Sequence, residues 1–310
     1  MMLNRSEAAE RAAAWRALRL FTTPSCILLT RLLLILICAP TTQAAPYRLG
    51  LGVYSSQKPK DAAAHYLPFT KALQTALSQR FEQPVEVYLS VMRTYEDGER
   101  FLQEGDVDFL ELGAANYVLA RKKNPDLELL AVRSPSDANL LAGVICVRSN
   151  SNIATVKDLK GKSIAFGNSR STTGHFLSQQ HLVELGILAK DFARQTHLGS
   201  HREVAAAVAS GQYDAGALNM IEFEQALRNG HHLRILSRFR NFGRPWVCRS
   251  ALPVKLKQAL KQSLLEVPLV PSIGASGDTN TTILAADDGY FDGLREAMKT
   301  DGVFNGRRRP

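Results

Sequence analysis

The hydrophobic and polar positions of the chain predict short strands that alternate with amphipathic helices. In the first half, apolar runs of strand length are separated by segments with hydrophobic residues at helical spacing. Gly105 follows the second of these helices in the position that commonly ends one. Strands that alternate with helices indicate parallel sheets built from βαβ units. The predicted strands are 47–53, 85–89 and 107–112, with helices at 62–81 and up to Glu104 between them.

The second half of the chain repeats this order. Strands are predicted at 162–166, 194–198 and 213–218, with helices at 174–185 and 203–210 between them. In both halves the second helix is followed by a glycine, a variable residue, an apolar residue and an aspartate, at 105–108 and 211–214. We interpret the repeat as two similar α/β lobes; a chance likeness between common helix–strand turns is the alternative.

Two further apolar strands are predicted to cross between the lobes, at 140–148 and 246–249. Two extended crossings between two α/β lobes predict a hinged clamshell. Its ligand is expected in the cleft, because ligands of parallel α/β sheets bind at the carboxyl ends of the strands. The expected domains are 45–147 with 244–310 for the first lobe, and 148–243 for the second.

The first 44 residues have the pattern of an export signal. A basic segment precedes a short apolar core at 32–38, and small residues follow up to Ala45. We therefore expect a signal peptide at 1–44, cleaved near Ala44. Since the core is far shorter than the ~20 apolar residues of a membrane-spanning helix, an uncleaved anchor is the weaker alternative. The bulky Ile37 disfavours lipidation at Cys38.

The composition indicates a globular protein and gives no support for a nucleic-acid partner. Hydrophobic residues make up 45% of the 310 residues and charged residues 22%. The net charge is +9. Five arginines and two glutamates in the first 44 residues contribute +3 of this charge, and the arginines at 307–309 contribute another +3. The remaining body is mildly basic, and no stripe of Lys and Arg is interleaved with aromatic residues.

Cys146 and Cys248 are the two cysteines that remain outside the signal segment, each within an apolar strand-like run. Two buried free thiols are the expected outcome. A disulfide is the alternative, because the compartment is oxidising and the two crossing strands are expected to lie side by side. The chain has no CxxC and no Cys/His cluster with zinc spacing, so we expect neither a metal nor a cofactor.

A cluster of hydroxyl side chains marks the turn between strand 162–166 and the next helix. The cluster consists of Ser169, Ser171, Thr172 and Thr173. One N-cap side chain satisfies one or two of the free N–H groups of a helix, so four hydroxyl side chains are more than capping requires. The surplus hydroxyls, the free N–H groups and the helix dipole favour an anion, and a tetrahedral oxyanion fits such donors. A Ser/Thr-rich capping loop is the alternative.

The next strand-to-helix junction adds a histidine to the same edge of the sheet. Ser200 and Glu203 have the spacing of a capping box. This spacing puts His201 in the first turn of the helix. By itself, such a residue would be interpreted as an ordinary surface histidine.

Together these residues resemble a known family. Ser171-Thr172-Thr173-Gly174, with Gly199-Ser200-His201 thirty residues further on, is similar to the motif of the phosphate, phosphite and phosphonate substrate-binding proteins of ABC transporters. The segments 66–69, 158–163 and 206–216 agree with that family. The resemblance extends from about residue 47 to residue 265. Thr173 stands where the family has a second serine, which keeps the hydroxyl.

The resemblance implies an α/β, two-lobed type II periplasmic-binding-protein clamshell with two hinge-crossing strands. It also implies that Ser171, Thr172 and Thr173 hold a phosphorus oxyanion and that His201 contacts one of its oxygens. Ser169 is a further hydroxyl candidate of the same loop. Family members often add tyrosines from the first lobe, for which Tyr66 and Tyr54 are the candidates.

The chain also departs from the family. Leu140 and Leu141 occupy a position where a tyrosine is common, and Arg244 occupies a region where aminophosphonate binders carry a carboxylate. Glu222 is the candidate for the other such carboxylate. These departures disfavour an amino-bearing ligand and leave phosphite, phosphate and small unsubstituted phosphonates, as well as a degenerate site in a sensor.

The leading hypothesis is a monomeric, periplasmic solute-binding protein that captures a phosphorus oxyanion and delivers it to the membrane permease of an ABC uptake transporter. The alternative is a periplasmic ligand-sensing protein of the same fold that reports to a signalling partner. An enzyme is the third class, with Ser171 and His201 as nucleophile and base. We expect no catalysis, because the sequence has neither a G-x-S-x-G motif nor a metal-ligand pattern.

Overall fold

The computed structural model describes residues 45–54, 59–267 and 281–306. The expected signal peptide at 1–44 lies outside these residues. The described residues from Pro46 onward belong to one compact unit. Within the described ranges, none of the helices combines the length and the apolar character needed to cross a membrane.

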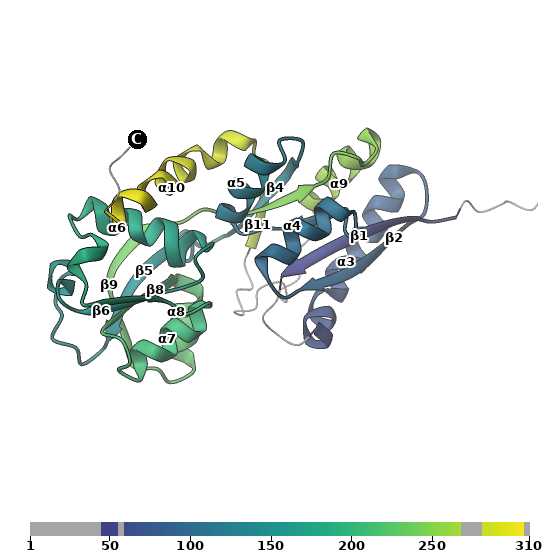
Figure 1. Cartoon of the computed structure of the whole chain (residues 1–310). Helices are drawn as coiled ribbons and strands as arrows, with labels where there is room; N and C mark the ends of the chain where they lie inside the picture. The colour runs from purple at the N-terminus through teal and green to yellow at the C-terminus, as the bar shows by residue number, and fades with distance from the viewer. Residues whose placement is uncertain (1–44, 55–58, 268–280, 307–310) are drawn as a thin grey trace, which may run out of the picture. The chain divides into compact units, whose positions relative to one another are not determined.

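The first sheet has six strands in the order β11-β4-β10-β3-β1-β2. Figure 1 labels four of them: β11, β4, β1 and β2. β1 is parallel to β2 and β3, whereas β10 is antiparallel to both β3 and β4. The strands are β1 (Tyr47–Tyr54), β2 (Val85–Met92), β3 (Phe109–Glu111), β4 (Glu128–Pro135), β10 (Arg244–Cys248) and β11 (Thr281–Leu284). The helices associated with this sheet are α3 (Pro59–Phe81), α4 (Tyr95–Glu104), α5 (Ala114–Lys123) and α9 (Val254–Glu266).

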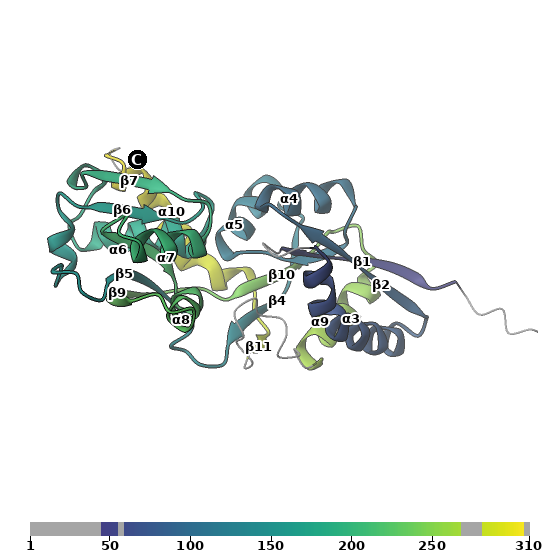
Figure 2. The ribbon, with the colours of Figure 1, turned by 90° about the horizontal axis from the view of Figure 1, so that it is seen from below.

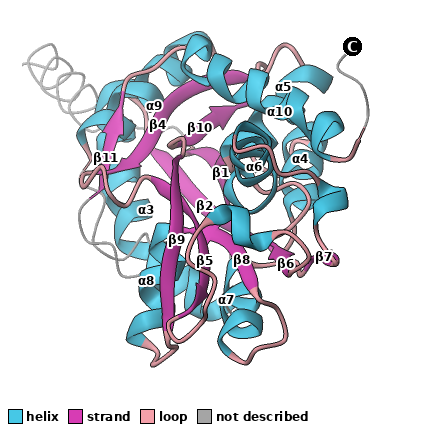
Figure 3. Cartoon of the chain, turned by 90° about the vertical axis from the view of Figure 1, so that its left-hand side faces the viewer, coloured by secondary structure: helices cyan, strands magenta, loops and turns pink. Residues whose placement is uncertain are grey.

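The second sheet has five strands in the order β7-β6-β8-β5-β9, which lie side by side in Figure 3. They are β5 (Ala142–Arg148), β6 (Ser163–Phe166), β7 (Arg194–His197), β8 (Ala215–Asn219) and β9 (Leu233–Arg240). The helical segments here are the wide π-helical turn η2 (Thr172–Leu177), α6 (Ser178–Glu184), α7 (His201–Ala209) and α8 (Met220–Arg228), with the short turns η1 (Val156–Leu159) and η3 (Ala189–Asp191). After β11, the short turn η4 (Asp288–Phe291) leads into the last helix, α10 (Asp292–Phe304).

Local sequence signals explain where several helices begin and end. Thr94 caps α4 by accepting a hydrogen bond from the backbone N–H of Asp97, whose carboxylate in turn binds the Thr94 N–H. Gly105 ends α4 with φ of 81°, a left-handed conformation that glycine adopts without steric cost. Leu49, Leu51 and Val53 of β1 alternate with glycines and pack in a fully buried core under α3 and α9.

The chain changes sheet twice, between β4 and β5 and between β9 and β10 (Figure 2). The segments that cross, 136–141 and 241–243, therefore precede the apolar strands that the sequence assigned to the crossings. Those strands are regular members of the sheets: β5 pairs with β8 and β9, and β10 pairs with β3 and β4. The division into domains at residues 147 and 243 remains a prediction.

Cys146 and Cys248 are buried free thiols, so the disulfide alternative is wrong and the expectation of two free thiols is confirmed. The cause is the position of the crossings. Cys146 lies on β5 in the second sheet and Cys248 on β10 in the first sheet, so the two residues are not on neighbouring strands.

Candidate functional site

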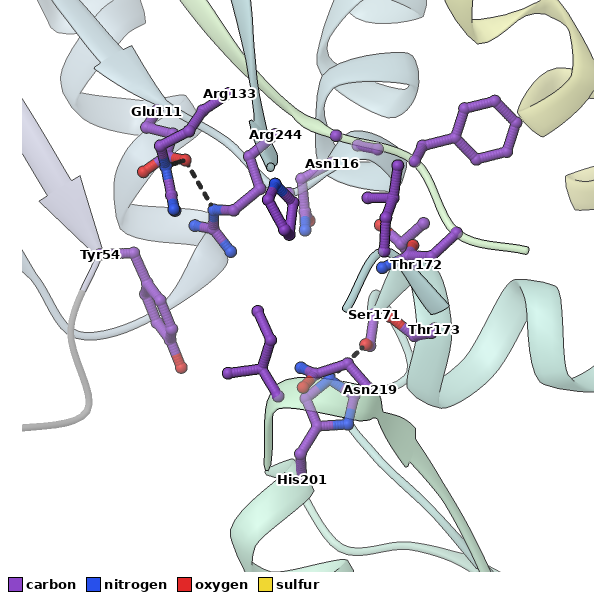
Figure 4. Close-up of a pocket in the computed structure, with 18 of the residues that line it drawn as sticks. Tyr54, Glu111, Asn116, Arg133, Ser171, Thr172, Thr173, His201, Asn219 and Arg244 are labelled. Atoms are coloured by element: carbon purple, nitrogen blue, oxygen red, sulfur yellow. Dashed lines mark hydrogen bonds and ion pairs between the residues drawn. The ribbon is translucent and has the colours of Figure 1, made fainter. Parts of the chain in front are cut away.

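A cavity of about 220 Å³ is lined by residues of both sheets and of both crossing segments (Figure 4). Most of its polar lining follows the carboxyl ends of strands or the first turns of helices, as expected for an α/β protein. The polar residues of the lining are Tyr54, Tyr66, Tyr95, Glu111, Asn116, Arg133, Ser171, Thr172, Thr173, His201, Asn219, Glu222, Asn241 and Arg244.

Ser171 and Thr172 each accept a backbone N–H through the hydroxyl oxygen. Ser171 is the N-cap of η2, and its Oγ accepts a hydrogen bond of 3.0 Å from the N–H of Gly174. The Oγ1 of Thr172 accepts one of 2.9 Å from the N–H of Ala115, in the first turn of α5. Since each hydroxyl also carries a proton, both can still donate to a ligand.

Two helix N-termini meet at this cavity. One is the start of η2, which continues into α6, and the other is the start of α5 at Gly113 and Ala114. Gly113 has no side chain to cap α5, so the first free N–H groups of that helix are left to Thr172 and to the cavity. Both helix dipoles put partial positive charge at the cavity and favour an anion there.

Thr173 completes the row of hydroxyls. It is 4% exposed and lines the cavity. A Cβ placed on Gly143 of β5 would lie 2.5 Å from the Thr173 methyl carbon, so this methyl group packs directly on β5. Among the described residues the Thr173 hydroxyl has no hydrogen-bond partner, which leaves it for a bound molecule.

His201 is the first residue of α7, and its Nε2 lies 3.3 Å from the Oγ of Ser171. Burial first, and the positive charge of nearby Arg244 second, lower the pKa of His201 to about 4. The imidazole is therefore neutral at neutral pH. Within the described chain its Nδ1 is buried without a hydrogen-bond partner. We assign the ring proton to Nε2, which then donates a hydrogen bond to the Oγ of Ser171. The unpartnered Nδ1 carries no proton in this tautomer, and the proton of the Ser171 hydroxyl stays available for a ligand.

A pair of arginines shares one buried carboxylate at the other side of the cavity. Oε1 of Glu111 accepts hydrogen bonds of 2.7 Å from Nε of Arg133 and 2.9 Å from Nε of Arg244. Burial alone would raise the pKa of Glu111, but the two guanidinium groups outweigh it and hold that pKa below its usual value. Two cations and one anion leave this wall with a net positive charge.

The structure brings most of the sequence-predicted site residues to one cavity. Tyr54 and Tyr66 line it together with the Ser171–Thr173 row and His201. Tyr54 stacks on Tyr95 with ring centroids 4.7 Å apart, and burial raises the pKa of Tyr66 to about 12.

Ser169 is the exception, because it is exposed and lies outside the cavity lining. The turn that precedes η2 explains its position. The Oδ1 of Asn168 accepts the N–H of Arg170, and the carbonyl oxygen of Asn168 accepts the N–H of Ser171. This tight turn directs Ser169 to solvent while Ser171 faces the cavity.

Sequence reasoning missed several residues of the lining. Asn219 ends β8 and caps α8 by accepting the N–H of Glu222; an asparagine three residues before a glutamate was a readable cap signal. Glu111 and Arg133 offered no such signal, since their pairing joins separate strands. The structure describes no group of three or more His, Cys, Asp and Glu side chains able to hold a metal ion.

Comparisons with known proteins agree with this arrangement. The family model of the periplasmic substrate-binding proteins of phosphonate ABC transporters matches residues 51–297. A probable ABC transporter phosphite-binding protein, PhnD1 of Prochlorococcus marinus, is 33% identical over 132 residues, which are 40% of this chain and 44% of that protein. The tetrathionate sensor histidine kinase TtrS of Salmonella typhimurium is 24% identical over 143 residues, which are 44% of this chain and 23% of the kinase. The matches thus span less than half the length of these two curated relatives.

The fold resembles that of solved binding proteins. The structure of Prochlorococcus marinus PhnD1 in complex with methylphosphonate superposes with a TM-score of 0.67 at 23% identity, covering 82% of this chain and 97% of that one. This similarity confirms the two-sheet α/β fold of type II periplasmic binding proteins. By its family match the chain belongs to the periplasmic substrate-binding proteins of phosphonate ABC transporters. That family consists of binding proteins, in agreement with the expectation that the chain is not an enzyme.

Proposed function

We propose that the cavity binds a phosphorus oxyanion and that the chain delivers it to the permease of an ABC uptake transporter. The observation that carries this proposal is the meeting of three hydroxyls and two helix N-termini at one cavity. The methylphosphonate held by the similar PhnD1 structure is a ligand of this chemical class. Phosphonates, phosphite and phosphate remain the candidate ligands, and the periplasm remains the proposed compartment of a monomeric chain.

The proposed binding mode uses the hydroxyls as relays between helix N–H groups and the anion. The Ala115 N–H donates to Thr172 and the Gly174 N–H donates to Ser171, so each hydroxyl donates its own proton to an oxygen of the ligand. Such chains of hydrogen bonds strengthen one another in a buried site. Neutral His201 supports this mode. Its Nε2–H donates to the oxygen of Ser171, so the proton of the serine hydroxyl stays available for the ligand.

The test is the loss of affinity on removing two hydroxyls. Replacing Thr172 and Thr173 with valine preserves their shape but removes two donors, so we expect weaker binding of phosphite, phosphate or methylphosphonate by ~2–4 kcal/mol in isothermal titration calorimetry. Thr75, which lies on the exposed face of α3 and donates only to the carbonyl of Lys71, provides the matched control Thr75→Val. Unchanged affinity in the double variant would exclude this site.

The periplasmic sensor remains the second candidate, supported by the partial similarity to a sensor histidine kinase. Transport and sensing can be distinguished by the growth defect that follows deletion of the gene. Deleting the gene of a transport protein abolishes growth on the bound compound as sole phosphorus source even when the transporter is expressed from a constitutive promoter. Loss of a sensor is bypassed by such expression.

A further inference from the structure

The wall formed by Arg244 presents hydrogen-bond donors that the rest of the protein does not use. Nε of Arg244 donates to Glu111, which fixes the plane of the guanidinium group. Its side chain is nevertheless 37% exposed and points into the cavity (Figure 4). Among the described residues nothing accepts a hydrogen bond from its two Nη groups. A planar fork of this kind matches a carboxylate or another oxyanion.

Arg244 faces the row of hydroxyls from the other side of the cavity (Figure 4). The head group of a phosphonate already finds donors in Ser171, Thr172 and Thr173 and in the start of α5. The cavity is also larger than a bare oxyanion needs. At about 30 Å³ for each molecule of liquid water, about 220 Å³ holds roughly seven waters. Bonded atoms take less room than separate water molecules, so this volume exceeds what the five non-hydrogen atoms of phosphate need and accommodates a short substituent.

The charges around the cavity favour an acidic rather than a basic substituent. An amine is disfavoured at Glu111, because the two arginines that bind its Oε1 outweigh the charge of this single carboxylate. Glu222 also lines the cavity, but among the described residues the carboxylate that pairs with Arg244 is that of Glu111 and not that of Glu222. The Arg133–Glu111–Arg244 group keeps its net positive charge for a ligand.

We propose that the ligand of this cavity is a phosphorus oxyanion with a second acidic group on a short substituent, held by the Nη groups of Arg244. The proposal rests on the proposed function, since it takes the hydroxyl row to be the site of the phosphorus head. The apolar residues Leu141, Ile221 and Phe242 line the same cavity and contact the carbon atoms that join the two acidic groups.

The experiment compares three phosphonates of similar length by isothermal titration calorimetry: phosphonoacetate, ethylphosphonate and 2-aminoethylphosphonate. We expect phosphonoacetate to bind about ten- to a hundredfold more tightly than ethylphosphonate, and 2-aminoethylphosphonate to bind most weakly. In Arg244→Gln the preference for phosphonoacetate should fall below about threefold, while the affinity for ethylphosphonate changes little.

Arg249→Gln is the matched control for stability. Arg249 follows the other end of β10 and donates through Nε to Asp108 at 2.7 Å, an ion pair like that of Arg244 but outside the cavity lining. This variant should keep the wild-type order of affinities. The wild-type comparison does not depend on how well any variant folds.

The outcomes separate this inference from the proposed function. Equal affinities of the wild type for phosphonoacetate and ethylphosphonate would overturn the inference and leave phosphonate binding intact. Loss of all binding in a folded Arg244→Gln variant would also overturn it, because Arg244 would then hold the phosphorus head. If none of the three compounds binds to the wild type, the proposed function fails and the inference fails with it.

Discussion

At the scale of single residues, Gly174 determines how closely the hydroxyl row approaches His201. A Cβ at this position would lie 2.9 Å from Cε1 of His201 and 3.0 Å from the Cα of Gly167. Both distances are shorter than ordinary van der Waals contact. Gly174, which follows the three hydroxyl residues, and His201, thirty residues after Ser171, therefore pack directly against each other.

The substitution Gly174→Ala tests that contact. The added methyl group displaces the imidazole of His201 or the backbone of Gly167, so we expect a loss of ~1–3 kcal/mol in the free energy of unfolding and weaker anion binding. Chemical denaturation and calorimetric titration measure the two effects. Gly98→Ala in α4 is the control, since a Cβ there meets its nearest neighbour, the sulfur of Met92, at an ordinary 3.4 Å. A Gly174→Ala variant as stable and as tight-binding as the wild type contradicts the argument.

The burial of His201 predicts how stability depends on pH. The pKa of His201 is about 4 in the folded chain because of burial first and Arg244 second. An unfolded histidine has a pKa near 6.5. Between these values the unfolded chain binds a proton here and the folded chain does not. Stability is therefore complete above about pH 6.5 and falls as the pH decreases toward 4, by up to about 3 kcal/mol from this residue.

Urea denaturation of the ligand-free protein at pH 7.5, 6.0 and 5.0 measures this dependence. In His201→Gln the decrease in unfolding free energy over this range should be smaller than in the wild type. The exposed His232 offers the matched control His232→Gln, which should retain the wild-type decrease. Parallel pH profiles of the wild type and His201→Gln would show that His201 gains protons equally in the folded and unfolded chains.

At the scale of elements, the sequence predicted the parts of the site that depend on local pattern. The hydroxyl row predicted a helix start after β6, and the structure begins η2 there with Ser171 as its N-cap; Ser200, predicted as a cap, begins α7 at His201. The end of α4 at Gly105 follows from glycine's tolerance of positive φ. Each of these signals lies within a few residues of the structure that it determines.

The elements that the sequence did not predict depend on contacts between distant segments. Arg244 and Glu111 are separated by 133 positions and meet only because β10 inserts between β3 and β4. The same insertion separates Cys248 from Cys146, since the chain crosses between the sheets just before β10 rather than along it. Apolar strands that look alike in sequence do not reveal which sheet they join. Propensity and spacing cannot supply that information, because tertiary packing decides it.

At the scale of the whole described unit, α10 connects the cores of the two sheets. Leu294 and Ala297, in its first half, pack in a cluster that contains Val132 and Val247 of the first sheet. Phe304, its last residue, is fully buried beside Phe166 of the second sheet, with ring centroids 5.8 Å apart. Because this helix is anchored in both cores, we expect the two sheets to unfold cooperatively.

The substitution Phe304→Ala tests this coupling, because it removes a buried aromatic ring from the second core. We expect a loss of ~3–5 kcal/mol in the free energy of unfolding. The signal to follow is the fluorescence of Trp246, which is the single tryptophan of a chain that starts at Ala45 and is fully buried in the core of the first sheet. If α10 couples the two cores, the Trp246 transition moves to lower denaturant although the substitution lies in the other core. The neighbouring Val303, which is only half-buried, provides the control Val303→Ala, expected to have a much smaller effect. A Trp246 transition that stays in place while circular dichroism detects an earlier step would show that the two sheets unfold independently.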